Sequence, residues 1–303
     1  MPSQFPCVLS TKAVAVATVV TLAIGQPADA ELTLKISHRA RAVQPGEVVA
    51  LEVRPSELPI TVGATAFGGS VRFFPIADDD DTWVALVGID LTAPPGAHLV
   101  AVHATARDGT TVHQTYSLGV EPKEFQTRRL NVAPNFVSPP AEVIERIQRE
   151  ARQLAGIFAT ATDERFWDGG FLRPVSGDST SSFGRRSVFN GEARSPHSGT
   201  DFRAPEGTPI KAPNDGVVVL ATDLYFSGNV VILDHGWGLY SFFAHLSSIN
   251  VAVGDRVAQG AVVGQVGATG RVTGPHLHWT VRLNDARVDP LSLMQLFPAT
   301  ENH

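Results

Sequence analysis

Short runs of alternating hydrophobic and polar residues recur along most of the chain, and this alternation is the pattern of half-buried β-strands. Between residues 31 and 122 the runs are β-rich and are separated by glycine, proline or aspartate turns. Short strands at this spacing predict an N-terminal immunoglobulin-like β-sandwich. The runs are LTLKIS, EVVALEVRP, GSVRFFPI, TWVALVGID, HLVAVHATA and TVHQTYSLGV.

A helical pattern interrupts the strands once, within a linker region at residues 123–170. Ser138 can cap this helix and Pro139 fits its first turn. Its apolar residues recur at helical spacing and form one stripe, so we expect the helix to pack against a domain. The stripe consists of Val143, Ile144, Ile147, Ala151, Leu154 and Phe158.

The β pattern returns in residues 171–303, which predict a C-terminal domain built on an antiparallel sheet. Glycine and Asn-Asp-Gly turns separate its strands, and the only helical stretch is the tail PLSLMQLF. The fold class is therefore mostly β, with a linking helix. The predicted strands are TPIKAP, GVVVLAT, NVVILDH, LYSFFAHL, AVVGQVG and HLHWTVRL.

The N-terminus has the features of a secretory signal. Lys12 precedes the apolar run AVAVATVVTLAIG, and the small-residue site ADA follows at 28–30. This order predicts a signal peptide at residues 1–30 and export to the periplasm or the cell exterior. An uncleaved anchor is the alternative, but the run is short for a membrane span and no other stretch is long and apolar enough. After cleavage we expect no integral membrane segment.

Composition narrows the function further. The net charge is −6, which gives no broad basic surface and argues against nucleic acid as a partner. Cys7 is the only cysteine, and it would leave with the signal peptide. The mature chain then lacks a thiol, which excludes a cysteine nucleophile, thiolate metal ligands and disulfides.

Histidines are concentrated in the segment GPHLHW, which holds His276 and His278. In a strand these two side chains point the same way, with Cα atoms about 6.6 Å apart. Two polar residues on the solvent-exposed face of a sheet would give the same sequence pattern. Two imidazoles at this distance can also serve one small site.

The segment RSPHSGTDFRAP supplies a second group of candidate ligands, His197 and Asp201. They can meet at one ion only if the chain turns between them, which Gly199 permits. Together with one histidine of the 276–278 strand they would give three zinc ligands and leave a fourth position for water, as in catalytic zinc sites. The other histidine of that strand, or His245 in FFAHLSS, could then serve as acid or base.

These motifs occur in a chain whose residues 171–297 resemble the lysostaphin-type, zinc-dependent peptidoglycan endopeptidases. The matching segments begin at FGRRSVFNGEARSPHSGTDFRAPEGTPIKAPNDG, continue through GNVVILDHGWGLYSFFAHLSS and GATGRVTGPHLHW, and end at DPLSLM. The resemblance implies an enzyme that hydrolyses peptide cross-links of bacterial peptidoglycan. Peptide stems and cross-links of the cell wall are then the expected partners, and we expect a monomer.

The resemblance also implies a role for each residue of the site. His197, Asp201 and His278 correspond to the family's zinc ligands, whereas His245 and His276 correspond to its paired catalytic histidines. Phe243 departs from the family pattern, which commonly has tyrosine there. The lost hydroxyl implies a difference in substrate positioning, but no ligand is missing.

Other functions remain as alternatives. A non-catalytic regulator of the same fold could bind peptidoglycan and activate another cell-wall hydrolase, but such proteins have lost zinc ligands that are present here. The segment VAVGDRVAQGAVVGQVGA also looks like the strand pairs of biotinyl or lipoyl carriers, yet Lys211 in TPIKAPND lacks the usual carrier motif. Trp237, Trp279 and Tyr240 are candidates for lining a substrate groove, and the loop GATGRVTGP for bordering it.

Overall fold

The computed structural model describes residues 32–297, apart from residues 58, 60, 77–78, 132–138 and 181. The predicted signal peptide, Cys7 and the predicted cap Ser138 lie outside this part of the chain. Within it, neither helix combines the length and the apolar character needed to cross a bilayer.

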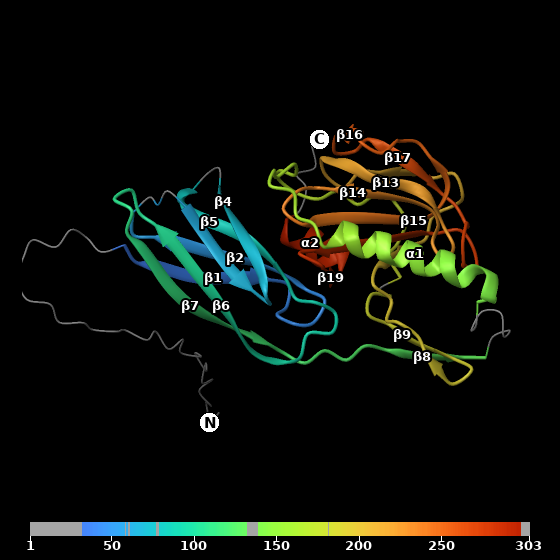
Figure 1. Ribbon diagram of the computed structural model, residues 1–303, viewed down its shortest axis with the longest axis horizontal. Helices are drawn as coiled ribbons and strands as arrows, with labels where there is room; N and C mark the ends of the chain where they lie inside the picture. Colours follow the sequence, from blue (N-terminus) through green and yellow to red (C-terminus); the bar gives the residue numbers. More distant parts are fainter. Residues whose placement is uncertain are drawn as a thin grey trace, which may run out of the picture. The chain divides into compact units, whose positions relative to one another are not determined.

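Seven N-terminal strands form one antiparallel sheet around a single core (Figure 1). Strand β4 pairs with β5 on one side and with β3 on the other, so both halves of the predicted sandwich belong to one hydrogen-bonded path. The two edge strands meet where His38 Nδ1 lies 2.6 Å from the Tyr116 hydroxyl, and the sheet is therefore nearly closed. The strands are β1 (Leu34–Ala40), β2 (Val48–Pro55), β3 (Thr61–Ala66), β4 (Gly69–Ile76), β5 (Asp79–Gly88), β6 (Gly96–Thr105) and β7 (Thr111–Val120).

Strand β2 is buried on both faces. Val49 and Leu51 belong to the core of the N-terminal sheet, whereas Val48 and Ala50 belong to a second core that contains much of the C-terminal sheet. Both sheets therefore share buried apolar surface. A polar network reinforces the contact, because Arg41 binds both Glu47 and Asp289, which is far away in sequence.

The linking region contains a strand that the sequence did not reveal. Strand β8 (Thr127–Leu130) runs parallel to β9 (Arg186–Phe189), which continues into β10 (Glu192–Ala193). The helix α1 spans Ala141–Phe158, and its N-cap is Pro140, which makes no side-chain capping bond. The predicted helix is thus present, but it begins three residues after Ser138.

The C-terminal strands form a mostly antiparallel nine-stranded sheet, and the mostly β fold class is confirmed. One face of its central strands packs against α1 through Phe158 and Leu154, while the other face forms the larger core (Figure 1). The elements are β11 (Thr200–Phe202), β12 (Pro209–Lys211), β13 (Gly216–Leu224), β14 (Gly228–Asp234), β15 (Leu239–Ile249), β16 (Arg256–Val257), β17 (Val262–Val266), β18 (Leu277–Leu283), β19 (Ala286–Val288) and α2 (Pro290–Leu296).

Alternation along β15 and β18 separates the two faces of this sheet. Phe243 pairs with Trp279, and both are buried in the larger core. Ala244 pairs with His278 on the opposite face, which is the face that α1 covers in part. His278 therefore lies on a rigid central strand, on the side of the sheet away from the larger core.

Candidate metal centre

Neighbouring strands place the first two candidate ligands side by side. Asp201 on β11 is directly opposite His278 on β18 in the antiparallel ladder. Residues in such register present their side chains on the same face, only a few ångströms apart. Oδ1 of Asp201 consequently lies 2.9 Å from Nδ1 of His278.

The third candidate ligand comes from the loop before β11. The backbone of His197 is held on both sides, because its N–H donates to the carbonyl of Arg185 and its own carbonyl accepts from Gly184. Between His197 and Asp201, the backbone at Gly199 lies against β18. A Cβ at Gly199 would lie 2.5 Å from the Trp279 carbonyl oxygen. The absence of a side chain at Gly199 thus lets the two backbones approach closely. This role comes in addition to the turn expected from the sequence.

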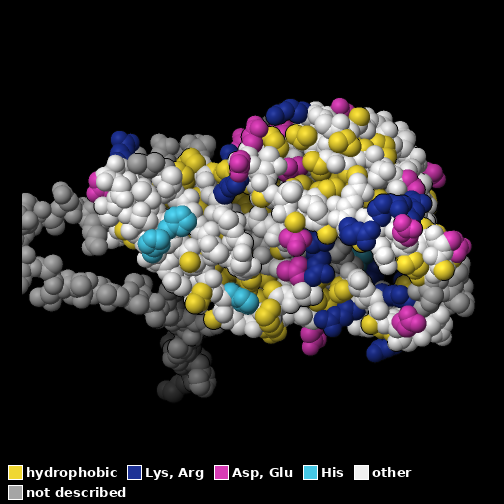
Figure 2. Space-filling model, in the orientation of Figure 1, with side chains coloured by type: hydrophobic (Ala, Val, Ile, Leu, Met, Phe, Trp, Pro, Cys, Tyr) yellow, Lys and Arg dark blue, Asp and Glu magenta, His cyan; other side chains and the backbone are white. Residues whose placement is uncertain are grey.

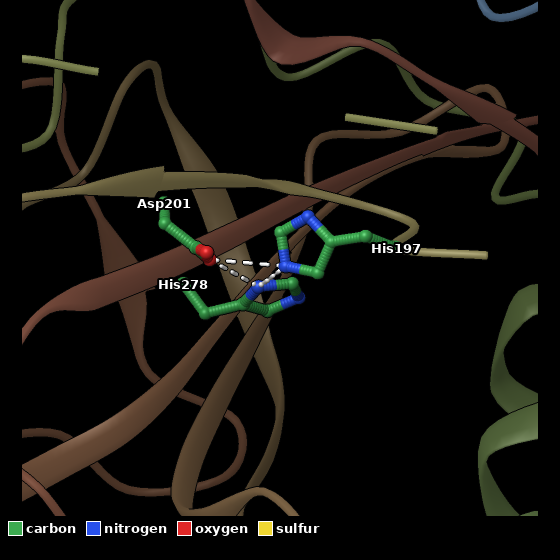
Figure 3. A group of neighbouring side chains, drawn as sticks. All are labelled: His197, Asp201 and His278. Carbon is green, nitrogen blue, oxygen red and sulfur yellow. Dashed lines mark hydrogen bonds and ion pairs between the residues drawn. The ribbon is translucent and has the colours of Figure 1, made fainter. Parts of the chain in front are cut away.

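The three side chains converge on one point (Figure 3). Nε2 of His197 lies 3.0 Å from Oδ1 of Asp201 and 2.9 Å from Nδ1 of His278. With the 2.9 Å between Asp201 and His278, these atoms form a nearly equilateral triangle. A tetrahedral ion with ligands at about 2.0–2.2 Å separates its ligand atoms by only slightly more.

Hydrogen bonds on the far side of each ring bear on the tautomers. Nδ1 of His197 lies 3.1 Å from the carbonyl oxygen of Ser182, which can only accept, so the proton of a neutral ring is on Nδ1. Nε2 of His278 lies 3.0 Å from the hydroxyl of Thr280, which can accept a proton from the ring or donate one to it. When Thr280 accepts, the ring nitrogens that face Asp201 both carry lone pairs, and the three facing atoms can bind one cation. Without a cation, a proton on either ring can instead be donated to Asp201.

Two further histidines flank this triangle. His276 and His245 have ring centroids 5.0 Å apart, and His245 is 5.9 Å from His278. Nδ1 of each ring is 2.9 Å from a backbone carbonyl, that of Gly274 for His276 and that of Thr269 for His245. In the neutral form each ring therefore carries its proton on Nδ1 and a lone pair on Nε2. Nε2 of His276 is 3.9 Å from Oδ1 of Asp201.

His245 reaches the site because β15 is irregular there. Strict alternation would place His245 on the same face as Phe243, in the larger core. His245 instead has a left-handed backbone, with φ of 67°, and the pairing registers of β15 shift on both sides of it. Such a bulge redirects a side chain and is costly for a residue other than glycine.

Regular alternation before the bulge explains the position of Phe243. Its side chain is fully buried and stacks on Trp279. The expectation that the missing hydroxyl would alter substrate positioning is therefore wrong for this structure, since the ring does not reach the groove.

Burial and neighbouring charges shift the pKa values of the site. Burial lowers the pKa of His278 and keeps its ring neutral. Burial alone would raise the pKa of Asp201, but the imidazoles of His197 and His278 outweigh it and hold this pKa well below its usual range. Burial, together with His278, lowers the pKa of His245 to about 4. His245 is thus a neutral base at pH 7.

Two supporting residues were not found from the sequence. The buried hydroxyl of Ser182 donates to Oδ2 of Asp201 at 3.2 Å, and the Thr280 hydroxyl lies 3.0 Å from Nε2 of His278. Thr280 could have been found, since it lies two residues after His278 on the same face of a strand. Ser182 is 19 residues from Asp201, and no sequence pattern connects them.

A cavity of about 570 Å³ opens beside the centre and includes Asp201 and His276 in its lining. The glycine-rich loop borders it through residues 273–275, as expected. The aromatic candidates do not line it. Trp279 and Tyr240 are buried, and the Trp237 indole donates to the carbonyl of Asp163.

Comparisons with known proteins identify the chain's relatives. Residues 195–290 match the model of peptidase family M23. A Neisseria meningitidis protein named DD-carboxypeptidase/endopeptidase Mpg is 44% identical over 97 residues, which are 32% of this chain and 22% of that protein. Peptidoglycan DD-endopeptidase ShyA of Vibrio cholerae is 48% identical over 84 residues, which are 28% of this chain and 20% of the relative. The chain thus spans only about a fifth of these two relatives.

A solved structure matches over much more of the chain. It is a Pseudomonas aeruginosa protein described as a peptidase M23, which is 34% identical with a TM-score of 0.66. The match covers 85% of this chain and 97% of that protein. It therefore extends from the N-terminal sheet through the metal-centre candidate. The chain belongs to peptidase family M23.

Proposed function

We propose that the protein is a zinc-dependent endopeptidase that hydrolyses peptide cross-links of bacterial peptidoglycan. The observation that carries the proposal is the convergence of potential ligand atoms from His197, Asp201 and His278. Two imidazoles and one carboxylate form a donor set that suits zinc, and three protein ligands are typical of catalytic zinc sites. Bound zinc would supply a Lewis acid that polarises the peptide carbonyl and lowers the pKa of water.

His245 and His276 are the proposed proton carriers. Each holds its Nδ1 proton on a backbone carbonyl, so the ring orientation is fixed and Nε2 is the atom that exchanges a proton. One ring can accept a proton from the attacking water, and a protonated ring can donate to the developing oxyanion or to the leaving amine. The low pKa of His245 keeps that ring ready to accept a proton at neutral pH.

The substrate follows from the relatives. The matched relatives include proteins named as peptidoglycan DD-endopeptidases. The match to the M23 family model, at residues 195–290, includes the five proposed site residues. We therefore propose a D,D bond between D-alanine and a diamino acid as the bond that is cut. We propose action in the periplasm or outside the cell, which agrees with the predicted signal peptide, and we propose that the protein acts as a monomer.

Digestion of purified peptidoglycan tests this function. The zinc-loaded protein should release fragments whose masses show hydrolysed cross-links, with new D-alanine carboxyl ends and new free amines. A chelator should abolish the release and added zinc should restore it. Intact peptidoglycan that binds the protein tightly would instead favour the non-catalytic regulator.

A further inference from the structure

Three arginines line the cavity beside the candidate metal centre. Arg128 comes from β8, Arg185 lies just before β9, and Arg203 follows β11 directly. The same lining includes Asp201 and His276. The three arginines therefore line the same cavity as a proposed ligand and a proposed proton carrier.

Strand pairing and backbone hydrogen bonds hold the three arginines in place. Arg128 is opposite Ser187 in the parallel β8–β9 pair. The carbonyl of Arg185 accepts from the N–H of His197, and the N–H of Arg203 donates to the carbonyl of Asp178. These positions are fixed relative to the ligands rather than carried by a free loop, which is what a binding site needs.

The three cavity arginines outnumber the acidic residues of the same lining. Arg41 binds Glu47, and Arg287 binds Asp90. In the part of the chain that the structure describes, no carboxylate forms an ion pair with Arg128, Arg185 or Arg203. Asp178 and Asp201 are the acidic residues of the cavity lining, and Asp201 is engaged by the histidines.

This local surplus contrasts with the net charge of −6 for the whole chain. Figure 2 shows Lys and Arg side chains interspersed with Asp and Glu side chains on the face that carries α1. The net charge of the whole chain therefore does not reveal that the cavity lining next to the candidate metal centre is basic. A cavity with unpaired guanidinium groups favours an anionic ligand, and the planar fork of arginine matches a carboxylate in particular.

We propose that Arg128, Arg185 and Arg203 form a subsite that binds a carboxylate of the substrate peptide beside the bond that is cut. The inference rests on the proposed function, which brings a peptide to the centre. Two sources have this chemistry, namely a free α-carboxylate at the end of a peptide stem and the side-chain carboxylate of a diamino acid.

Binding of fluorescent cross-linked peptides to the metal-free protein tests the subsite without catalysis. One peptide has both carboxylates free, a second has the terminal carboxylate amidated, and a third has the diamino-acid carboxylate amidated. We expect one amidation to weaken binding about tenfold or more, since it removes a charge-assisted contact. The amidation that does so identifies the source. Equal binding of all three peptides would overturn the proposal.

Arginine variants provide the matching test. Arg128→Gln, Arg185→Gln and Arg203→Gln should weaken binding of the free peptide about tenfold each and leave the sensitive amidated peptide nearly unaffected. Lysine at the same positions should restore part of the affinity. Arg107→Gln, in the exposed turn between β6 and β7, is the control and should bind like the unaltered protein. Losses that are equal for both peptides would refute a carboxylate contact.

The two proposals fail in different ways. If the zinc-loaded protein cleaves no peptidoglycan but binding depends on the arginines and the carboxylate, the endopeptidase function is wrong and the subsite stands. If cleavage occurs with the same KM for free and amidated peptides, the subsite is wrong and the endopeptidase function stands.

Discussion

Asp201 and His278 face each other across the β11–β18 ladder, with Oδ1 and Nδ1 2.9 Å apart. Neither atom has a proton to share when His278 donates its Nε2–H to Thr280. The pair therefore repels unless a cation or an added proton lies between the atoms. This relationship makes the candidate centre testable by metal analysis before any substrate is known.

Removal of either partner should abolish zinc binding. Asp201→Ala and His278→Ala each leave two ligands, too few for a tightly bound zinc ion. Elemental analysis should find about one zinc per chain in the unaltered protein and almost none in the two variants. His113→Ala, on an exposed strand of the N-terminal sheet, should keep full zinc. Full zinc in both ligand variants would remove the assignment.

Loss of a flanking histidine should separate catalysis from metal binding. His245→Ala and His276→Ala should retain zinc, because neither is a proposed ligand. Their kcat should fall on the order of 10²–10⁴, the usual contribution of a positioned acid or base. The measurement is kcat on cross-linked peptide together with zinc content of the same sample. Undiminished turnover in either variant would show that this histidine takes no part in the reaction.

The Thr280 hydroxyl should raise the zinc affinity of the centre through its contact with His278. Thr280→Val keeps the shape but removes the acceptor for Nε2–H, so the ring tautomer is no longer fixed. Zinc affinity should drop about 10–100-fold, as is typical when the outer partner of a histidine ligand is lost. Competition with a chromophoric chelator measures this without substrate. Thr280→Ser retains the hydroxyl and should bind zinc normally, and equal affinities in both variants would contradict the idea.

A methyl group at Gly199 should disturb both stability and the centre. The new Cβ would lie 2.5 Å from the Trp279 carbonyl and 2.8 Å from Cε1 of His278. Overpacking of this kind costs about 1–3 kcal/mol, and it should displace the His278 ring. Urea unfolding and zinc affinity should therefore both worsen in Gly199→Ala. Gly119→Ala is the matched strand control, because its Cβ would meet no atom within 4 Å.

His235 should make the fold sensitive to mild acid. The ring is completely buried, Nδ1 lies 2.7 Å from the Asp215 carbonyl and Nε2 lies 2.9 Å from the Ser241 hydroxyl. Burial lowers the pKa of His235 from 6.5 to about 4. The unfolded chain therefore takes up a proton first as the pH falls. Stability from this group is complete above pH 6.5 and declines toward pH 4, by about 3 kcal/mol in total.

Urea unfolding between pH 7.5 and 4.5 measures this effect. The free energy of unfolding of His235→Gln should be lower at neutral pH but should fall less as the pH is lowered. The difference between the two curves therefore reports the contribution of His235. Parallel curves would mean that the buried ring does not govern acid sensitivity.

Much of the fold was predictable because long strands show a clear alternation of hydrophobic and polar residues in the sequence. HLHWTVRL alternates strongly, and the corresponding strand is β18. Strand β11 has only three residues and exists through its pairing with β18, so sequence alone could not define it. Strand β8 lies in a stretch that reads as linker, and its partner β9 is more than 50 residues away.

The candidate site was predictable to the level of residue type. Histidines and an aspartate at suggestive spacings pointed to zinc, and the structure brings those side chains together. The bulge that turns His245 away from the core depends on pairing with two other strands. The contributions of Ser182 and the three cavity arginines depend on how distant segments fold together, and local patterns do not encode that.

The two-sided burial of β2 limits how this chain can be cut and recombined. Val48 and Ala50 belong to the core that contains much of the C-terminal sheet. A fragment that begins after residue 122 would therefore expose an apolar patch. Fusion of the C-terminal part to another protein would need polar substitutions on that patch, or a fusion that also includes β2 and β5. For protein engineering, the two sheets are therefore best treated as one folding unit.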